Sequence, residues 1–526
     1  MINQLPPELR TKHMILAGVW ASKEKPDMNE FFKPFVDEMN DIYDNGVQWN
    51  LDNTLVTSRF IATCCCMDSP ARCSALCMKQ YNGYYGCTFC YQKGKRINEV
   101  NKYPISTKVY KLRTSSEIKK QMTLIQTNKL KEIKGVLGPS ALMNLKDLDL
   151  VKGVTPEPMH TVFLGVTKHI TTMFLENTNE PYYIGTPTKI RMIDERLLSL
   201  TPPTKVTRRP RTISSYTIWK ASEWCSWLLS YILPCLIGIL PDKYLNHLSL
   251  FVKAIQILYQ DSIPIEELKN ARSLLIIFVT LFQEYYKDSS MNFIVHLLLH
   301  IADSVEYLGP LWAHNANYFE NENRIIMNMR KGPSHISKQI CKRYLFYKSL
   351  PSFASKITLG DKFYEFLEGF ENNIKNLFYF DDHILIGNGD KIKLNLEESQ
   401  LCGYEGECLS FKKIIYKKCR YTTKNYCNNK RFNDSVVRFK NNTYGIIIKI
   451  FCISDESETN TFLLCNEIIL TNEAVVNKRI THIKHCSINS NKYLMYSIND
   501  IFHQCSLITV NNEHYICELP KGCFGD

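Results

Sequence analysis

The chain has 526 residues, of which 45% are hydrophobic and 22% charged, a balance typical of a globular protein with sizeable cores. That length favours roughly two to four domains, and the sequence shows no internal repeat or low-complexity tract. The net charge of +12 is compatible with a polyanionic partner such as nucleic acid but does not prove one. The first ten residues contain no apolar stretch, so we expect a protein that is not secreted. In a reducing compartment its 20 cysteines should be free, metal-bound or catalytic.

The first 70 residues predict a strand, a helix and a second strand. Apolar runs at 13–20 and 59–67 predict the strands, and apolar spacing over 27–46 predicts an amphipathic helix that begins at Asp27 and ends at Gly46. This order indicates an α/β unit. The three consecutive cysteines at 64–66 fit the second strand as small apolar residues better than they fit disulfides.

Helical patterns dominate the middle of the chain, and strand patterns dominate its end. The stretches with helical spacing are 156–175, 218–300, 293–309 and 319–332. The apolar segment 224–240 is shorter than the roughly 20 residues of a membrane span and contains Pro234, so we expect a buried core helix. Residues 385–395 resemble a linker, and 434–451 predicts a hairpin in a small β domain.

Two pairs of residues have the spacing of metal ligands. Cys87 and Cys90 form a C-x-x-C turn, and His296 and His300 share one face of a predicted helix. Together they would form a closed, tetrahedral and structural Cys₂His₂ site. The alternatives are two unliganded thiols and two histidines satisfied by backbone or water.

Two acidic residues are candidates for catalysis. Asp68 ends the second apolar run, and Glu320 lies 20 residues after His300. Two-metal chemistry needs carboxylates that the fold brings together. Asp68 also fits a helix N-cap before Ser69, and Glu320 fits an ordinary solvated helix residue with Glu322 as an equal competitor.

Two basic stretches could contact phosphates, and in the second of them tyrosines could also stack on bases. The first is a loop at 204–211 and the second is the Tyr-interleaved segment 412–432. Each could equally be a solvated face. The candidate nucleic-acid-binding residues are Arg208, Arg209, Arg211, Lys417, Lys418 and Arg420.

The order acid, C-x-x-C, long helical stretch, H-x-x-x-H, acid resembles the DDE transposases of the CACTA/Mirage/Chapaev group. The stretches that carry the resemblance lie between about 10 and 350 and read "MDSPAR", "YYGCTFCYQKGK", "TPEPMHTVFLGVTKHI", "HLLLHIADSVEYLGPLW" and "YFENENR". It implies an α/β, RNase H-like core with a large helical insertion, followed here by the β domain. It also implies DNA as a possible partner and a possible homo-oligomer. The implied location is the nucleus or the cytoplasm.

The resemblance also assigns roles to residues. Asp68 matches the second catalytic acid and Glu320 the third, and the four Cys and His residues match ligands of a structural Zn²⁺. Mg²⁺ would bind only in an active member. The implied segments are a core part at 1–150, a helical insertion at 151–290, core-closing helices at 291–380 and the β domain at 390–526.

The family's first acid has no counterpart, because residues 1–12 contain no Asp. We therefore expect a transposase-derived chain that begins inside the fold and is not an active transposase. The alternative is a zinc-stapled DNA-binding or protein-interaction module without catalysis. A metal-dependent hydrolase would need an open metal site, which four protein ligands argue against.

Overall fold

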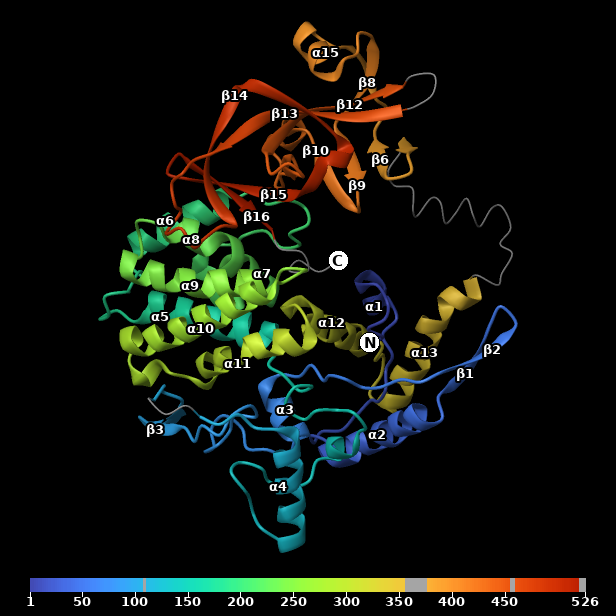
Figure 1. Ribbon diagram of the computed structural model, residues 1–526, viewed down its shortest axis with the longest axis vertical. Helices are drawn as coiled ribbons and strands as arrows, with labels where there is room; N and C mark the ends of the chain where they lie inside the picture. The colour runs from blue at the N-terminus through green and yellow to red at the C-terminus, as the bar shows by residue number, and fades with distance from the viewer. Residues whose placement is uncertain (107–109, 355–375, 455–458, 520–526) are drawn as a thin grey trace. The chain divides into compact units, whose positions relative to one another are not determined.

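The computed structural model describes residues 1–106, 110–354, 376–454 and 459–519 (Figure 1). The chain forms two compact units, each assembled from segments far apart in the sequence. The first comprises residues 1–171 and 257–356, and the second comprises 172–256 and 357–525. The boundaries at 150, 290 and 390 stay a prediction. The expected mixed α and β composition is confirmed.

The predicted helix near the N-terminus is confirmed and is fixed by local signals. Helix α2 spans Met28–Asp44, and the Asp27 side chain accepts hydrogen bonds from the backbone N–H groups of Asn29 and Glu30. The helix stops before Gly46, whose φ of +74° suits a residue without a side chain. The neighbouring elements are α1 (Pro7–Lys12), β1 (Val47–Leu51), β2 (Thr54–Ser58), α3 (Ser69–Ala75), β3 (Lys95–Ile97), β4 (Val100–Lys102) and α4 (Ser115–Asn128).

The strands predicted at 13–20 and 59–67 are wrong, because neither segment pairs with a strand. A strand is stable only when a neighbour satisfies its backbone groups. Cys65 N–H instead donates to the carbonyl of Gly153, and the Met14 carbonyl accepts from the Tyr344 hydroxyl. Cys64, Cys65 and Cys66 are half-buried there. The described cysteines form no disulfide.

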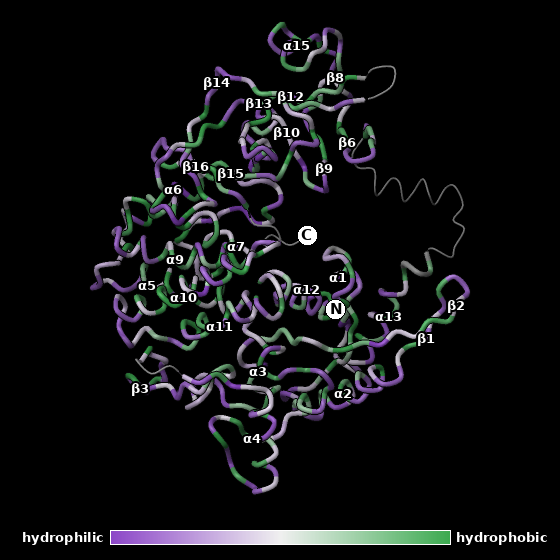
Figure 2. The backbone as a smooth tube through the Cα atoms, in the orientation of Figure 1, coloured by the Kyte–Doolittle hydropathy of each residue, from purple (hydrophilic) through white to green (hydrophobic). Residues whose placement is uncertain are grey.

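Helices form the rest of the first unit. The stretch predicted to be helical from 156 begins as a π-helix, η2 (Met159–Thr167), and continues as α5 (Lys168–Glu176). Helices α10 and α11 pack against each other, and α11 also packs against η2. Apolar residues recur along α10 and α11, in green in Figure 2. The later helices are α10 (Ile265–Tyr286), α11 (Phe293–Leu308), α12 (Asn317–Asn328) and α13 (Ile336–Ala354).

The second unit has a helical part that contains the expected core helix. Its described apolar residues from Trp224 to Leu236 are buried. In the described part of the chain, no helix has the length and hydrophobicity to span a membrane. The elements are α6 (Pro187–Ser199), α7 (Ala221–Ser226), the π-helix η4 (Trp227–Tyr231), α8 (Ile232–Leu236) and α9 (Asp242–Leu258).

Its β part is a closed barrel. Six strands pair in the ring β11-β15-β16-β14-β13-β12, which the β12–β11 pairing closes, and β8 and β7 extend it beyond β12. The hairpin predicted at 434–451 is confirmed as β11 and β12, with Val436 opposite Ile446. The barrel strands are β11 (Val436–Phe439), β12 (Tyr444–Ser454), β13 (Thr459–Leu470), β14 (Ile483–Ser497), β15 (Ile501–Val510) and β16 (Glu513–Glu518).

The linker predicted at 385–395 is wrong, because strands β6 and β7 occupy it. Gly387 and Gly389, both with positive φ, form the turn between them. Strand β6 joins a four-stranded sheet of order β10-β9-β6-β5. The remaining elements are β5 (Leu377–Tyr379), β6 (His383–Ile386), β7 (Asp390–Lys393), α15 (Leu396–Cys402), β8 (Glu407–Phe411), β9 (Lys413–Tyr416), β10 (Cys419–Thr422) and α16 (Lys424–Cys427).

A buried histidine joins the barrel to the helical part of the second unit and makes its stability depend on pH. His482, just before β14, is 2% exposed, and its Nε2 lies 3.1 Å from the Leu229 carbonyl oxygen. Burial, assisted by the charge of Lys253, lowers the pKa of His482 to about 4 from an ordinary value of 6.5. The unfolded chain therefore binds a proton between these pH values that the folded chain does not.

We expect the free energy of unfolding to fall by up to about 3 kcal/mol as the pH drops from 6.5 to 4 on account of His482 alone. His482→Gln removes the titrating ring and retains a donor for Leu229, so this variant should lose less stability over that range. Urea unfolding followed by circular dichroism at several pH values measures the difference. The control is His335→Gln, at an exposed position. Its free energy of unfolding should fall over this pH range by as much as that of the unaltered protein.

Candidate metal centre

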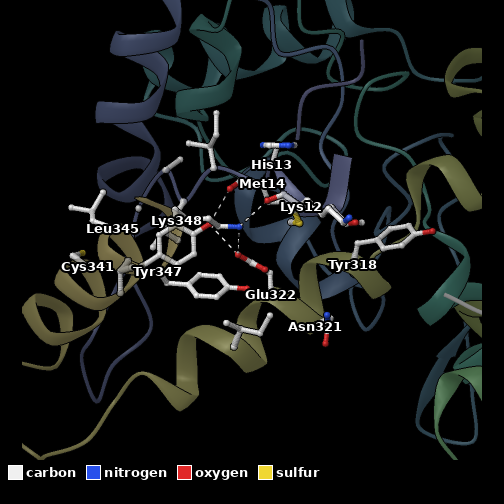
Figure 3. Close-up of a pocket in the computed structure, with 18 of the residues that line it drawn as sticks. Lys12, His13, Met14, Tyr318, Asn321, Glu322, Cys341, Leu345, Tyr347 and Lys348 are labelled. Carbon is white, nitrogen blue, oxygen red and sulfur yellow. Dashed lines mark hydrogen bonds and ion pairs between the residues drawn. The ribbon is translucent and has the colours of Figure 1, made fainter. Parts of the chain in front are cut away.

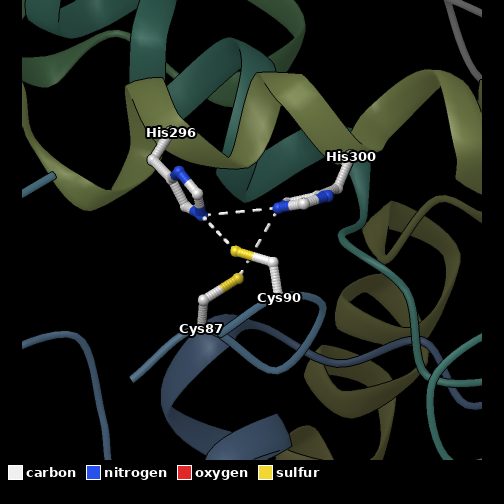
Figure 4. Close-up of side chains that lie close together, drawn as sticks. All are labelled: Cys87, Cys90, His296 and His300. Atoms are coloured by element: carbon white, nitrogen blue, oxygen red, sulfur yellow. Dashed lines mark hydrogen bonds between the residues drawn. The ribbon is translucent and has the colours of Figure 1, made fainter. Parts of the chain in front are cut away.

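Four side chains from two distant segments converge in the first unit. The Sγ atoms of Cys87 and Cys90 and one ring nitrogen each of His296 and His300 all lie within 4.8 Å of one another, and all four residues are buried (Figure 4). Cys87 Sγ is 3.7 Å from His300 Nε2, and Cys90 Sγ is 3.5 Å from His296 Nε2. The two Nε2 atoms are 3.4 Å apart.

These distances are those of a tetrahedral metal site. Zinc bonds of usual length require sulfur and nitrogen ligands about 3.5 Å apart and two nitrogens about 3.3 Å apart. The cluster can therefore hold one metal ion, such as zinc. Four protein ligands would leave no open position on the ion, which is the arrangement of a structural site.

Each half of the cluster is held in place by its surroundings. The buried Arg113 guanidinium donates through Nε to the carbonyl oxygens of Cys87 at 2.9 Å and Cys90 at 3.1 Å, which fixes the turn. On the other side His296 and His300 lie one helical turn apart on α11, so both rings face the thiols. The Tyr103 ring stacks on His296.

The two thiols have opposite tendencies to ionise. Burial opposes ionisation of Cys87, but the hydrogen bond with Cys90 and the two imidazoles hold the pKa of Cys87 well below the usual value for a thiol. The hydrogen bond with Cys87, together with burial, raises the pKa of Cys90. A bound cation would favour the thiolate form of both cysteines.

The structure gives the two candidate acids different roles. Asp68 caps helix α3, and its Oδ1 accepts from the Ala71 N–H at 2.7 Å. Glu320 lies in the first turn of α12, and its Oε1 is 3.1 Å from His160 Nε2. Within the described residues, the Cys₂His₂ cluster is the only group of three or more Cys, His, Asp or Glu residues close enough to share an ion.

Glu322, the competing acid, faces a different environment. It accepts from the Tyr344 hydroxyl at 3.0 Å and pairs with Lys348 at 3.3 Å (Figure 3). These residues line a cavity of about 1260 Å³ between segment 11–19 and helices α12 and α13. Glu322 is therefore committed to an ion pair, whereas the side chain of Glu320 is 53% exposed beside His160.

Sequence reasoning missed two residues of this region, Glu157 and His160. Glu157 is 1% exposed, and its Oε1 lies 2.5 Å from His160 Nδ1. Its two oxygens also accept from backbone N–H groups of Met159 at 2.8 Å, His160 at 2.6 Å and Ala316 at 3.4 Å. The available signal was an acid three residues before a histidine at a helix start in "PEPMH".

The predicted nucleic-acid-binding residues fall into two groups. Arg211 forms a two-point ion pair with the buried Glu223, and two guanidinium nitrogens of Arg420 contact Oδ2 of the buried Asp434. Both pairs are structural. The other four are exposed in a loop and in the tight turn between β9 and β10, namely Arg208, Arg209, Lys417 and Lys418.

Comparison with known proteins adds no relative. No protein-family model matches the chain, and no curated protein matches it.

We expect the purified protein to contain one zinc ion per chain. Cys87→Ser should remove it and lower the thermal unfolding midpoint, because the folding free energy of such sites includes the binding free energy of the metal. Elemental analysis and thermal unfolding with and without a chelator measure both effects. Cys77→Ser, a half-buried thiol in the same region, is the matched control and should retain the zinc. Full zinc content in Cys87→Ser would contradict the assignment.

Proposed function

We propose that the chain is a transposase-derived protein whose zinc-stapled, RNase H-like remnant supports DNA binding without strand transfer. The observation that carries the proposal is the Cys₂His₂ cluster. The motif order implies that these four residues share one ion, although His296 follows Cys90 by 206 positions. In the folded chain their side chains lie close enough together to bind a single ion. Such a protein would act in the nucleus.

The surroundings of the acids support the absence of strand transfer. Two-metal catalysis needs several carboxylates around a pair of ions roughly 4 Å apart. Asp68 is occupied as a helix cap and Glu320 pairs with a histidine, and in the described parts of the chain no three acids lie close enough together to share an ion. A nicking and strand-transfer assay with Mg²⁺ or Mn²⁺ tests this point, and robust activity that Asp68→Ala abolishes would overturn it.

The charge distribution supports a DNA partner. The net charge is +12, and Arg208 and Arg209 are exposed in a loop of the second unit. Lys417 lies over the Tyr416 ring in the turn between β9 and β10. Cations at loops and turns can approach a phosphate backbone without losing protein contacts.

A protein-interaction module is the second candidate. The closed metal site and the closed barrel both favour a rigid scaffold, and neither requires a nucleic acid. The two candidates differ in salt dependence, since DNA binding through phosphate contacts weakens steeply as salt rises.

We expect the protein to bind duplex DNA with an affinity that falls steeply between about 50 and 200 mM salt. The double variant Arg208→Ala/Arg209→Ala should weaken binding and reduce the slope of log affinity against log salt by roughly 2. Fluorescence anisotropy with labelled duplexes measures both.

The matched control is Lys129→Ala/Lys131→Ala, which removes equal charge from exposed positions after helix α4. Binding by the control should stay close to that of the unaltered protein. If both double variants weakened DNA binding equally, the loss would come from the lower net charge and not from contacts made by Arg208 and Arg209. The absence of salt-dependent binding would favour the interaction module.

A further inference from the structure

A cavity of about 390 Å³ in the first unit reaches the Cys₂His₂ cluster, because His300 forms part of its wall. This volume lies within the range of roughly 300–1,000 Å³ that is usual for small-molecule sites. The wall combines apolar side chains such as Phe89 and Val151 with the polar residues Ser115, Ser116 and Lys152. A lining of this kind suits a ligand that has one polar and one apolar end.

The first turn of helix α4 supplies backbone N–H groups to this wall. Thr114 is the N-cap, and its Oγ1 accepts from the Glu117 N–H at 3.3 Å. The N–H groups of Ser115 and Ser116 precede the hydrogen bonds of the helix, and no described residue accepts from either. Free N–H groups give this end of a helix a partial positive charge, so helix starts of this kind bind phosphate groups.

Two buried guanidinium groups at the cavity lack hydrogen-bond partners for some of their nitrogens. Arg113 forms part of the wall and is 3% exposed, and its Nη1 has no partner among the described residues. Arg72 is 1% exposed, and its guanidinium lies 5.0 Å from the centre of the Phe89 ring. Its Nε and Nη2 have no described partner, and its Nη1 reaches the Thr155 carbonyl oxygen only at 3.5 Å. Buried donors without partners are rare, and here they indicate a negatively charged ligand.

The acids of the wall do not neutralise these cations. Asp303 accepts from Arg272 at 2.9 Å, and Asp149 Oδ1 accepts from the backbone N–H groups of Val151 and Lys152 at 2.8 Å each. Both carboxylates therefore have other donors. A zinc ion with two thiolates and two neutral imidazoles carries no net charge, so the neighbouring cluster would not neutralise the guanidiniums either.

We propose that this cavity binds a small phosphate monoester, with its phosphate group at the start of α4 and its organic group against Phe89 and Val151. The N–H and hydroxyl groups of Ser115 and Ser116 and the ammonium group of Lys152 are donors for the three terminal oxygens. Ser115 Oγ accepts from the Leu150 N–H at 3.1 Å, which leaves its own proton free to donate.

The size of the cavity distinguishes this ligand from the backbone of DNA. Each phosphate of a duplex is a diester with a nucleoside on both sides, whereas a cavity of about 390 Å³ accommodates one small organic group. A monoester also carries a third terminal oxygen, which matches the number of donors in the wall. The site therefore adds a small-molecule ligand to a protein whose proposed partner is DNA, and it does not depend on DNA binding.

The experiment uses the full-length protein with its zinc in place, phenyl phosphate as the probe and inorganic phosphate for comparison. Isothermal titration calorimetry in a buffer without phosphate or sulfate should show one site per chain. Phenyl phosphate should bind more tightly than inorganic phosphate, because its ring contacts the apolar part of the wall. Hydrogen–deuterium exchange followed by mass spectrometry should show slower exchange over residues 113–118 when the probe is bound and no change over α13.

Lys152→Gln and Lys131→Gln form the matched pair, since both lysines are exposed. The first should weaken binding of phenyl phosphate about tenfold, and the second should leave it unaltered. Ser116→Ala, which removes one hydroxyl donor, should also weaken binding. Equal binding by Lys152→Gln and the unaltered protein, or protection from exchange only outside 113–118, would overturn the proposal. Displacement of the probe by duplex DNA without terminal phosphates would overturn it as well, because the site would then take diesters.

Discussion

The first unit depends on a junction between one turn and one helix. The C-x-x-C turn belongs to an N-terminal segment with little regular structure, and its partners lie on α11, whose apolar residues are largely buried. An ion at the junction would tie this segment to a helix whose apolar residues are largely buried. Buried Arg113 and the ring of Tyr103 keep the two halves in position, so the cluster is built as part of the core.

Local sequence signals predicted the helices correctly, but they predicted two strands that the structure does not contain. Helix α2 could be predicted because its cap, its apolar spacing and its glycine stop all lie within 20 residues. The runs at 13–20 and 59–67 have the composition of strands, but a strand also needs a neighbour, and composition does not reveal whether one exists. The supposed linker at 385–395 failed because its glycines mark a turn between β6 and β7.

The spacing of ligand pairs along the chain explains why the Cys₂His₂ cluster could be predicted and the group around His160 could not. Cys87 with Cys90, and His296 with His300, each show ligand spacing locally, so only their meeting had to be inferred. His160 and Glu320 are 160 residues apart, and neither belongs to a recognisable ligand pair. The ion pairs of Arg211 with Glu223 and of Arg420 with Asp434 span only 12 and 14 residues, but the sequence does not show which arginine of a basic run meets a buried carboxylate.

The separation of the cluster's two halves along the chain has a consequence for synthesis. His296 follows Cys90 by 206 residues, and a ribosome adds roughly 5–20 residues per second, so the thiols emerge roughly 10–40 s before their partners. During that interval the C-x-x-C pair can bind an ion with two ligands only, and it is open to oxidation or to capture by other thiols. The nascent chain is therefore exposed to these reactions while residues 91–295 are being made.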